Sequence, residues 1–180
     1  MYEDLKIILY PDPRLFKMSK PVEKFDQSLK DLAARMFMLM RENRGVGLAA
    51  PQVGLNVRMF VMNPTGQPAD DRVYVNPQLS DPAESDEAEE GCLSLPKINA
   101  KVLRSDSIHM KARDLEGKAI EQLEAGYIAR IWQHEVDHLN GTLLLDHMGP
   151  LAKIGARKIL KELEQRYKEE QEAKRKRPSP

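Results

Sequence analysis

Apolar residues recur at three- and four-residue spacing across residues 27–42, which predicts an amphipathic helix near the N-terminus. Asp26 precedes this run and can cap the helix through its carboxylate, whereas Gly45 and Gly47 follow the run and favour its end. We therefore expect a helix from Asp26 to about Glu42. Its apolar face would consist of Leu29, Leu32, Ala33, Met36, Phe37, Leu39 and Met40.

Beyond Gly54 the pattern changes to short runs with high β propensity, separated by clusters of turn-forming residues. These runs predict antiparallel strands at Val57–Met62, Val73–Val75, Ser107–Ala112 and Lys118–Gln122. The acidic stretch at residues 80–87 is interpreted as a loop. Residues 1–24 contain three prolines, which predicts an extended arm that packs on the rest of the chain.

Two further helical patterns occupy the C-terminal part of the chain. One covers residues 126–140, and Gly141 is placed to end it. The other begins at Pro150, because proline is favourable at the first position of a helix. Its apolar stripe is Leu151, Ile154, Ile159, Leu160, Leu163 and Tyr167. The charged tail at residues 168–180 is expected to be a frayed end.

The length of 180 residues, with 41% apolar and 31% charged residues, fits one globular domain over residues 1–180. The 28 basic and 28 acidic residues give no net charge, so no specific DNA partner is expected. No run approaches the ~18 apolar residues of a membrane span, and the N-terminus has neither a secretory signal nor a transit peptide. We expect a cytoplasmic protein without a membrane partner.

Candidate chemistry is concentrated in residues 134–138, which read His-Glu-Val-Asp-His and form an HExxH motif inside the helical run. Four residues advance a helix by about one turn, so both imidazoles lie on one face and can bind the same cation. Glu135 would stand beside that cation. The alternative is a chance match in a charged surface helix, where these side chains are merely solvated.

A third protein ligand would distinguish the two interpretations, because catalytic metals commonly take three and keep one position for water. The metzincin pattern HExxHxxGxxH is matched as far as Gly141, but Leu144 occupies the third histidine position. A thermolysin-like site would use Glu162 or Glu164, although solvation is the simpler interpretation in so charged a helix. The remaining candidate is Cys92, the only cysteine, whose alternative role is that of a buried thiol.

Three motifs follow one another along the chain. Residues 45–54 read GVGLAAPQVG, residues 90–96 read EGCLSLP, and residues 133–141 read QHEVDHLNG. Together they resemble the three signature motifs of the peptide deformylase family. The resemblance implies an α+β fold, with small antiparallel β-sheets around a central HExxH helix, an N-terminal helix and a C-terminal helix. It also implies a hydrolase that removes the formyl group from the N-terminal formylmethionine of newly synthesised polypeptides and releases formate.

The resemblance implies one divalent metal ion, with ligands at Cys92, His134 and His138. Thiolate and imidazole ligands suit several first-row metals, so the residues alone leave the metal open. The family points to Fe²⁺ in the cell, which Zn²⁺, Ni²⁺ or Co²⁺ can replace. Glu135 would accept the proton of the attacking water. Gln52 and the backbone N–H of Leu93 would stabilise the developing oxyanion, although Gln52 could also be an ordinary polar turn residue.

Matching to the family also suggests a pocket for the methionine side chain. The candidate residues are Gly45, Val46, Gly47, Glu90, Tyr127, Arg130 and Ile131. The glycines would let the backbone approach a peptide, the apolar residues would form the wall, and the charged residues would flank it; core packing is the alternative. Arg104 matches an arginine of the family, with an ordinary surface ion pair as the alternative. His109 and His147 stand outside the motifs and are expected to be structural.

The expected partners are formylated nascent polypeptides, and the protein is expected to be a monomer. Residues 174–177 read KRKR and could bind ribosomal RNA phosphates, because the C-terminal helix of some family members docks on the ribosome. The alternative is that these cations only solvate the helix end. A zincin protease and a peptide-binding module without activity are the competing functions. Leu144 in place of the third metal-binding histidine argues against the protease. The intact motif residues argue against the inactive binding module.

Overall fold

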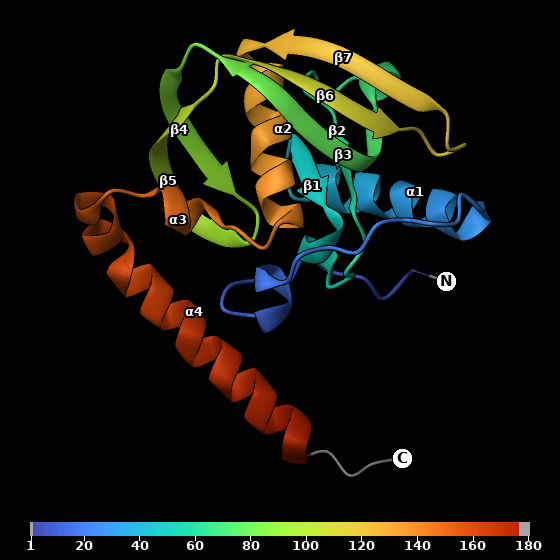
Figure 1. The fold of residues 1–180 in the computed structure, drawn as a ribbon. Helices are drawn as coiled ribbons and strands as arrows, with labels where there is room; N and C mark the ends of the chain where they lie inside the picture. The colour runs from blue at the N-terminus through green and yellow to red at the C-terminus, as the bar shows by residue number, and fades with distance from the viewer. Residues whose placement is uncertain (1, 177–180) are drawn as a thin grey trace.

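The structure is a computed structural model that describes residues 2–176 (Figure 1). Its helices are α1 (Gln27–Glu42), α2 (Gly126–Leu139), α3 (Leu144–His147) and α4 (Pro150–Lys176). Its strands are β1 (Gly47–Ala49), β2 (Met59–Met62), β3 (Arg72–Ala83), β4 (Asp86–Cys92), β5 (Leu95–Arg104), β6 (Ser107–Arg113) and β7 (Ala119–Ala125). Short 3-10 turns occur at Pro13–Phe16, Ala50–Val53 and Pro68–Asp70. The predicted α+β class with small antiparallel sheets is confirmed.

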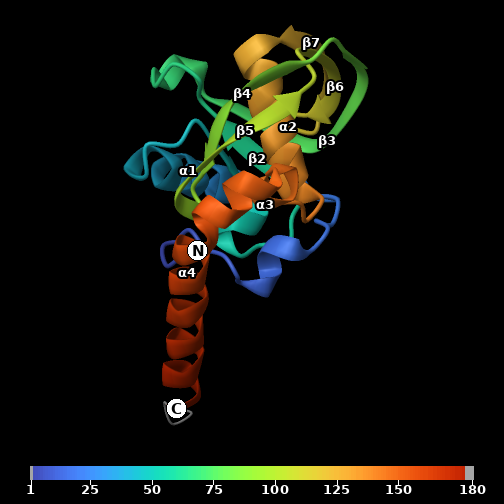
Figure 2. The same ribbon diagram turned by 90° about the vertical axis from the view of Figure 1, so that its left-hand side faces the viewer.

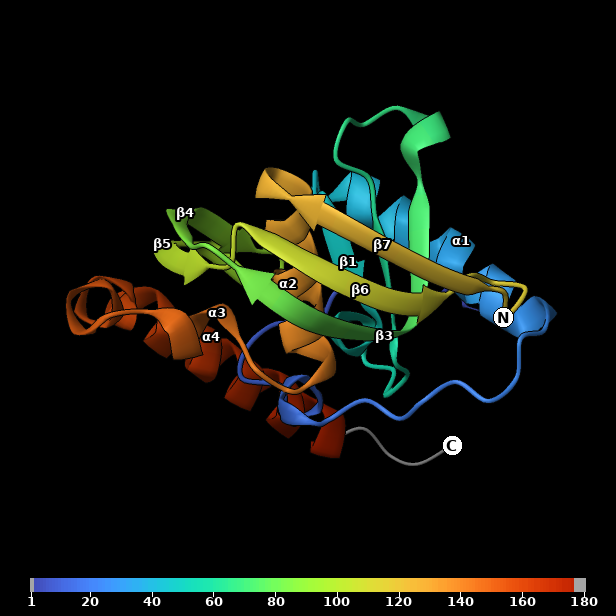
Figure 3. The ribbon, with the colours of Figure 1, turned by 45° about the horizontal axis from the view of Figure 1, so that its top comes forward.

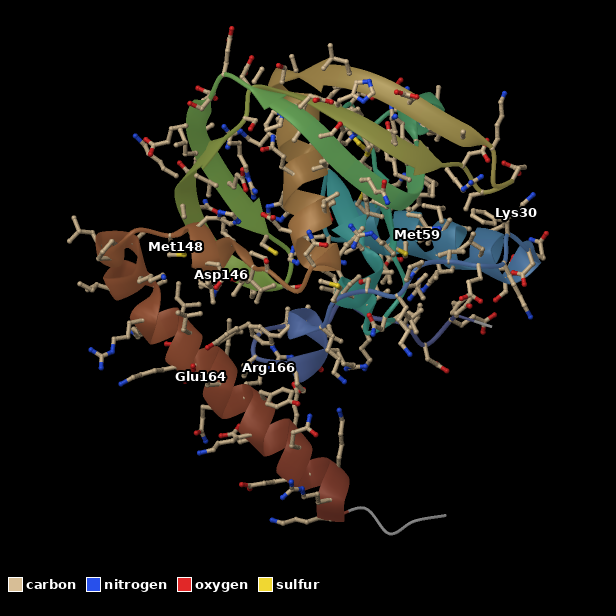
Figure 4. The ribbon with its side chains drawn as sticks, in the orientation of Figure 1. Lys30, Met59, Asp146, Met148, Glu164 and Arg166 are labelled. Carbon is tan, nitrogen blue, oxygen red and sulfur yellow. The ribbon has the colours of Figure 1, made fainter. Side chains whose placement is uncertain are left out.

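Helix α1 forms as its sequence pattern predicts. The Asp26 carboxylate accepts a hydrogen bond from the Leu29 N–H at 3.2 Å, which satisfies one of the free donors at the start of the helix. All seven apolar residues predicted for its inner face are buried. They pack on β1 and β2, with Met59 among the buried residues of the same core (Figure 4).

The strands form a five-stranded antiparallel sheet, in the order β1-β2-β3-β6-β7, and a separate β4–β5 pair (Figure 3). The predicted strands at Val57–Met62 and Val73–Val75 correspond to β2 and part of the much longer β3. The loop predicted for residues 80–87 is wrong, because β3 continues to Ala83 and β4 begins at Asp86. The outer end of β3 is exposed on both faces, so its residues carry no alternation of apolar and polar side chains.

Helix α2 lies between the five-stranded sheet and the β4–β5 pair (Figure 1). Trp132 is fully buried on its sheet-facing side and packs against Tyr74 of β3. Gly141 follows the helix with a φ of +76°, which favours glycine. A Cβ atom there would also lie 2.6 Å from the carbonyl oxygen of Phe16, so the predicted end of the helix requires glycine for space as well.

The N-terminal arm binds to segments that carry the sequence motifs. Its Ile8 N–H donates to the Gln52 carbonyl at 2.8 Å, and its Tyr10 N–H donates to the Ser94 carbonyl at 3.0 Å. The Ser19 N–H donates to the Leu139 carbonyl at 2.8 Å. These bonds hold the arm against the turn after β1, the β4–β5 turn and the end of α2.

Helix α4 packs on β5 near its start and then extends out from the sheets, where its residues between Leu163 and Lys174 line a cavity with the N-terminal arm (Figure 2). Leu163 and Ala156 are its buried residues, and Glu164 accepts a hydrogen bond from the Tyr10 hydroxyl at 2.9 Å (Figure 4). Residues 168–176, expected as a frayed tail, continue the helix. Whether this end of the helix frays is a question of motion and stays a prediction. Arg177, the last residue of the basic KRKR segment, lies outside the described residues.

Candidate metal centre

Three potential metal ligands meet at the centre of the molecule. Cys92 ends β4, whereas His134 and His138 lie one turn apart on α2, and their ligand atoms all lie within 4.8 Å of one another. The Cys92 Sγ atom is 3.2 Å from the His138 Nε2 atom. Across residues 2–176 this is the group of His, Cys, Asp and Glu side chains that could hold one metal ion. The other proposed third ligands, Glu162 and Glu164, are exposed on α4.

The His134 ring is oriented by a buried carboxylate. Its Nδ1 atom lies 3.0 Å from the Glu90 Oε2 atom, and an ionised carboxylate can only accept, so Nδ1 carries a proton and Nε2 is left for a metal. Burial raises the pKa of Glu90, but hydrogen bonds from His134 and Arg104 outweigh it and hold that pKa well below its usual value. Glu90 is therefore ionised at neutral pH.

The two histidines respond differently to their surroundings. Burial lowers the pKa of both, and for His138 this effect dominates, so its pKa lies well below the usual value and its ring is neutral. Around His134, hydrogen bonds with Cys92 and Glu90 overcome burial and raise the pKa well above the usual value. A cation that binds His134 must compete with a proton, and its affinity should weaken as the pH falls.

Glu135 lies beside this cluster and is almost fully buried, with 4% of its surface exposed. Burial raises its pKa to about 7, a suitable value for a group that accepts and returns a proton at neutral pH. Its Oε2 atom has no hydrogen-bond partner within residues 2–176, and a buried polar atom of this kind requires one. A Cβ atom at Gly47 would lie 2.3 Å from its Oε1 atom, so glycine is needed beside the carboxylate.

Gln52 belongs to the 3-10 turn after β1 and is buried. Its Oε1 atom accepts a hydrogen bond from the Ala49 N–H at 2.8 Å, which directs the Nε2 amide toward the site. That nitrogen lies 3.6 Å from the Cys92 Sγ atom and 3.3 Å from the Ser94 Oγ atom. Gln52 therefore presents an N–H donor beside the cluster, whereas an ordinary turn residue would point to solvent. Leu93 follows Cys92 in the turn between β4 and β5.

A cavity of about 510 Å³ opens beside the cluster and lies over the residues predicted to bind substrate. The predicted residues that line it are Gly45, Val46, Gly47, Gln52, Glu90, Cys92, Leu93, Tyr127, Arg130, Ile131, His134 and Glu135. Sequence reasoning missed the remaining lining residues, Asn43, Arg44, Glu89, Gly91, Pro96 and Lys97. Each of these lies within or next to a motif, so adjacency was the available signal.

The predicted pocket residues differ in how they meet the cavity. Tyr127 and Val46 are exposed at 56% and 37%, whereas Ile131 is buried. Glu90 and Arg130, expected to flank the substrate, are buried and joined by an ion pair of 2.9 Å. Their charges are therefore committed to the protein interior before a substrate binds.

Arg104 contacts Glu90, the carboxylate that orients His134. The alternative that Arg104 forms an ordinary surface ion pair is wrong. Only 6% of the residue is exposed, and its guanidinium donates two hydrogen bonds to Glu90, at 2.9 and 3.0 Å. It also donates to Asp137 at 2.5 Å, and His147 Nε2 lies 2.8 Å from the same carboxylate. Asp137 and His147 were not predicted to take part, because nothing in the local sequence indicates these contacts.

The family model described as polypeptide deformylase matches residues 4–153 of the chain. The chain belongs to the peptide deformylase family. A peptide deformylase of Thermotoga maritima is 43% identical over 160 residues, which cover 88% of this chain and 95% of that protein. The chloroplastic or mitochondrial peptide deformylase 1B of Arabidopsis thaliana is 43% identical over 170 residues, or 92% of this chain. The alignment spans 62% of that plant protein's length.

Solved structures of the family have the same fold. A plant peptide deformylase crystal structure superposes with a TM-score of 0.91 at 40% identity, covering 100% of this chain and 97% of that one. The enzyme of Plasmodium falciparum superposes with a TM-score of 0.88 at 38% identity, covering 91% of this chain and 97% of that one. The prediction of an enzyme of this family, which removes the N-formyl group from nascent polypeptides, is confirmed.

Proposed function

We propose that the family's reaction takes place at the Cys92, His134 and His138 cluster, with one divalent metal ion held by these three side chains. The observation that carries this proposal is their convergence beside Glu135, whose buried Oε2 atom has no partner within residues 2–176. One thiolate and two imidazoles fit a first-row transition ion and leave a position for water. When bound, such an ion acts as a Lewis acid that makes a hydroxide nucleophile available near neutral pH.

Glu135 carries the proton in the proposed mechanism. Its carboxylate accepts a proton from the water that attacks the formyl carbon, and later gives that proton to the amine nitrogen of methionine. The carbon–nitrogen bond breaks, and formate and a free amine leave. The pKa of about 7 suits both halves of this transfer.

Gln52 and Leu93 stabilise the negative charge that forms on the substrate in this mechanism. Negative charge develops on the formyl oxygen as the water adds, and fixed donors at that oxygen stabilise the transition state more than the ground state. The Gln52 Nε2 amide, held in place by the Ala49 N–H, and the backbone N–H of Leu93 supply them. Val46, Tyr127 and Ile131 would contact the methionine side chain.

The proposal also covers the identity of the metal, the oligomeric state, the compartment and the domain organisation. Fe²⁺ is the ion proposed for the cell, and the ligand set would also accept Zn²⁺, Ni²⁺ or Co²⁺. The chain is proposed to act as a monomer in the cytoplasm and as one catalytic domain, in which α4 packs on β5 through Ala156. None of the helices formed by residues 2–176 has the length and apolar character needed to cross a bilayer.

A direct assay distinguishes the competing functions. The protein, purified without oxygen and loaded with Fe²⁺ or Ni²⁺, should release formate from a formyl-Met peptide and leave an unblocked protein intact. A zincin protease would cleave the unblocked protein, and a binding module would do neither. Metal analysis of the same sample ensures that inactivity is not caused by an empty site.

The ribosome is the second proposed partner, through the end of α4. This helix extends out from the sheets and ends in Lys174, Arg175 and Lys176, so its cations can reach RNA phosphates without covering the active cavity (Figure 2). Deletion of residues 171–180 should weaken co-sedimentation with ribosomes at low salt and leave activity on a short formyl-Met peptide unchanged. Equal sedimentation of both proteins, or binding by the full chain that salt does not affect, would show that the tail is only a solvated helix end.

A further inference from the structure

The mouth of the active cavity carries three exposed charged side chains. Arg44 precedes the first motif, Lys97 follows the second, and Glu89 stands on β4; all three line the cavity. Of the other acidic and basic side chains around the cavity, Glu90, Arg130 and Glu135 are buried, and His134 is half-buried among the proposed metal ligands. A substrate that reaches the mouth therefore meets two cations and one anion.

These three side chains are not committed to contacts within the protein. In the part of the chain that the structure describes, residues 2–176, no ion pair or side-chain hydrogen bond involves Arg44, Lys97 or Glu89. Arg44 and Lys97 also have left-handed backbone conformations, with φ of +57° and +64°. Residues other than glycine rarely adopt this conformation, and here it has local causes: Arg44 follows the C-cap of α1, and Lys97 lies where the β4–β5 register shifts.

A polypeptide substrate must pass these residues. Its formyl group has to reach Glu135 and its methionine side chain the apolar wall, so the residues after methionine leave through the mouth. Asn43, Leu93 and Pro96 also line a neighbouring cavity, so the two cavities adjoin there. Beyond the mouth, that neighbouring cavity has balanced charges, from Glu3, Asp4 and Glu42 on one hand and Lys6, Arg35 and Arg166 on the other. The neighbouring cavity therefore adds no net charge to that of the mouth.

We propose that Arg44 and Lys97 determine specificity and favour polypeptides with acidic residues directly after the formylmethionine. The inference rests on the proposed function, because it names the substrates that the same cavity prefers. Aspartate or glutamate side chains in these positions would pair with the two cations, whereas lysine would be repelled by them. Because the pairs are exposed to solvent, each contributes modestly and weakens with salt.

The test compares three formylated tetrapeptides, formyl-Met-Asp-Asp-Ala, formyl-Met-Lys-Lys-Ala and the neutral formyl-Met-Ala-Ala-Ala. With the metal-loaded protein at low salt, kcat/KM for the acidic peptide should exceed that for the basic peptide by roughly threefold or more, mainly through KM. The ratio should shrink at high salt. The double variant Arg44→Glu and Lys97→Glu should invert it, because the mouth then carries three anions.

A matched control separates a local effect from one of overall charge. Lys158→Glu with Lys161→Glu changes the net charge equally, but both side chains are exposed on α4 and do not line the cavity. This control should keep the wild-type ratio. An equal rate on the two charged peptides, a preference for lysine, or the same inversion in the control would overturn the inference. Hydrolysis of the neutral peptide would still support the proposed function, whereas failure on all three peptides would overturn both.

Discussion

The variant Glu135→Gln should keep its metal and lose nearly all turnover. Glutamine has the same shape as glutamate but cannot accept a proton, so the step in which water is deprotonated loses its base. Loss of a general base typically costs about 10²–10⁴-fold in rate. Since Cys92, His134 and His138 are untouched, the metal content should match that of the wild type. Formate release under saturating substrate, with metal content measured on the same sample, gives the result.

The matched control for this variant is Glu162→Gln on α4. Glu162 is exposed and stands in the helix considered for a thermolysin-like ligand, so the same change there should leave both turnover and metal content at wild-type values. Near-normal formate release by Glu135→Gln would reject the proposed role of Glu135. Loss of metal in Glu162→Gln would instead revive the thermolysin-like arrangement.

The sequence predicted well those elements in which apolar residues recur at a regular spacing. The three- and four-residue spacing in α1 located its buried face, and the spacing in residues 126–140 located α2 within one residue of its end. Strand β5 was not predicted although it carries a two-residue period, because buried Ile98, Ala100 and Val102 alternate with exposed residues. Strand β4 lacked such a signal. On β4 the acidic residues Glu87 and Glu89 are exposed, and the single buried one, Glu90, is charged too, so no apolar alternation marks the strand.

The metal ligands of the candidate site could be predicted, because histidine pairs and lone cysteines in motifs serve few other purposes. Two histidines at helical spacing and a lone cysteine in a motif suggested a metal site, and the structure brings the three together. Arg104 was singled out by its match to the family, but its burial between Glu90 and Asp137 was not predictable, because an arginine is usually solvated. Such pairings join segments far apart in sequence, and no local pattern encodes them.

Geometry explains why the cysteine on β4 can meet the histidines on α2. The antiparallel register between β4 and β5 shifts between the pairs Gly91–Asn99 and Cys92–Leu95, so Cys92 stands at the end of β4 where the regular pairing stops. A Cβ atom at Gly91 would lie 2.9 Å from the Asn99 Oδ1 atom, so a small residue suits this position. Leu93, the next residue, lines the cavity.

The variant Cys92→Ala should lose most of its affinity for metal. The thiolate is the one anionic ligand of the proposed set, and its removal leaves two neutral imidazoles. Loss of a residue that merely supports a ligand costs about 10–100-fold in metal affinity, so loss of the ligand itself should cost more. Titration of the variant with Ni²⁺ or Zn²⁺ measures this change. Cys92→Ser is the matched variant, because it keeps the size of the side chain and exchanges the thiolate for a hydroxyl.

X-ray absorption on the wild type adds a result that misfolding could not imitate. A metal–sulfur distance near ~2.3 Å is expected if the thiolate is bound. Cys92 is the only cysteine of the chain, so the disappearance of that distance in Cys92→Ala would assign it to this thiol. Unchanged metal affinity in the variant, together with no such distance in the wild type, would reject Cys92 as a ligand. In that case the two histidines would need another third partner, and the position of the Cys92 Sγ atom 3.2 Å from His138 would reflect packing alone.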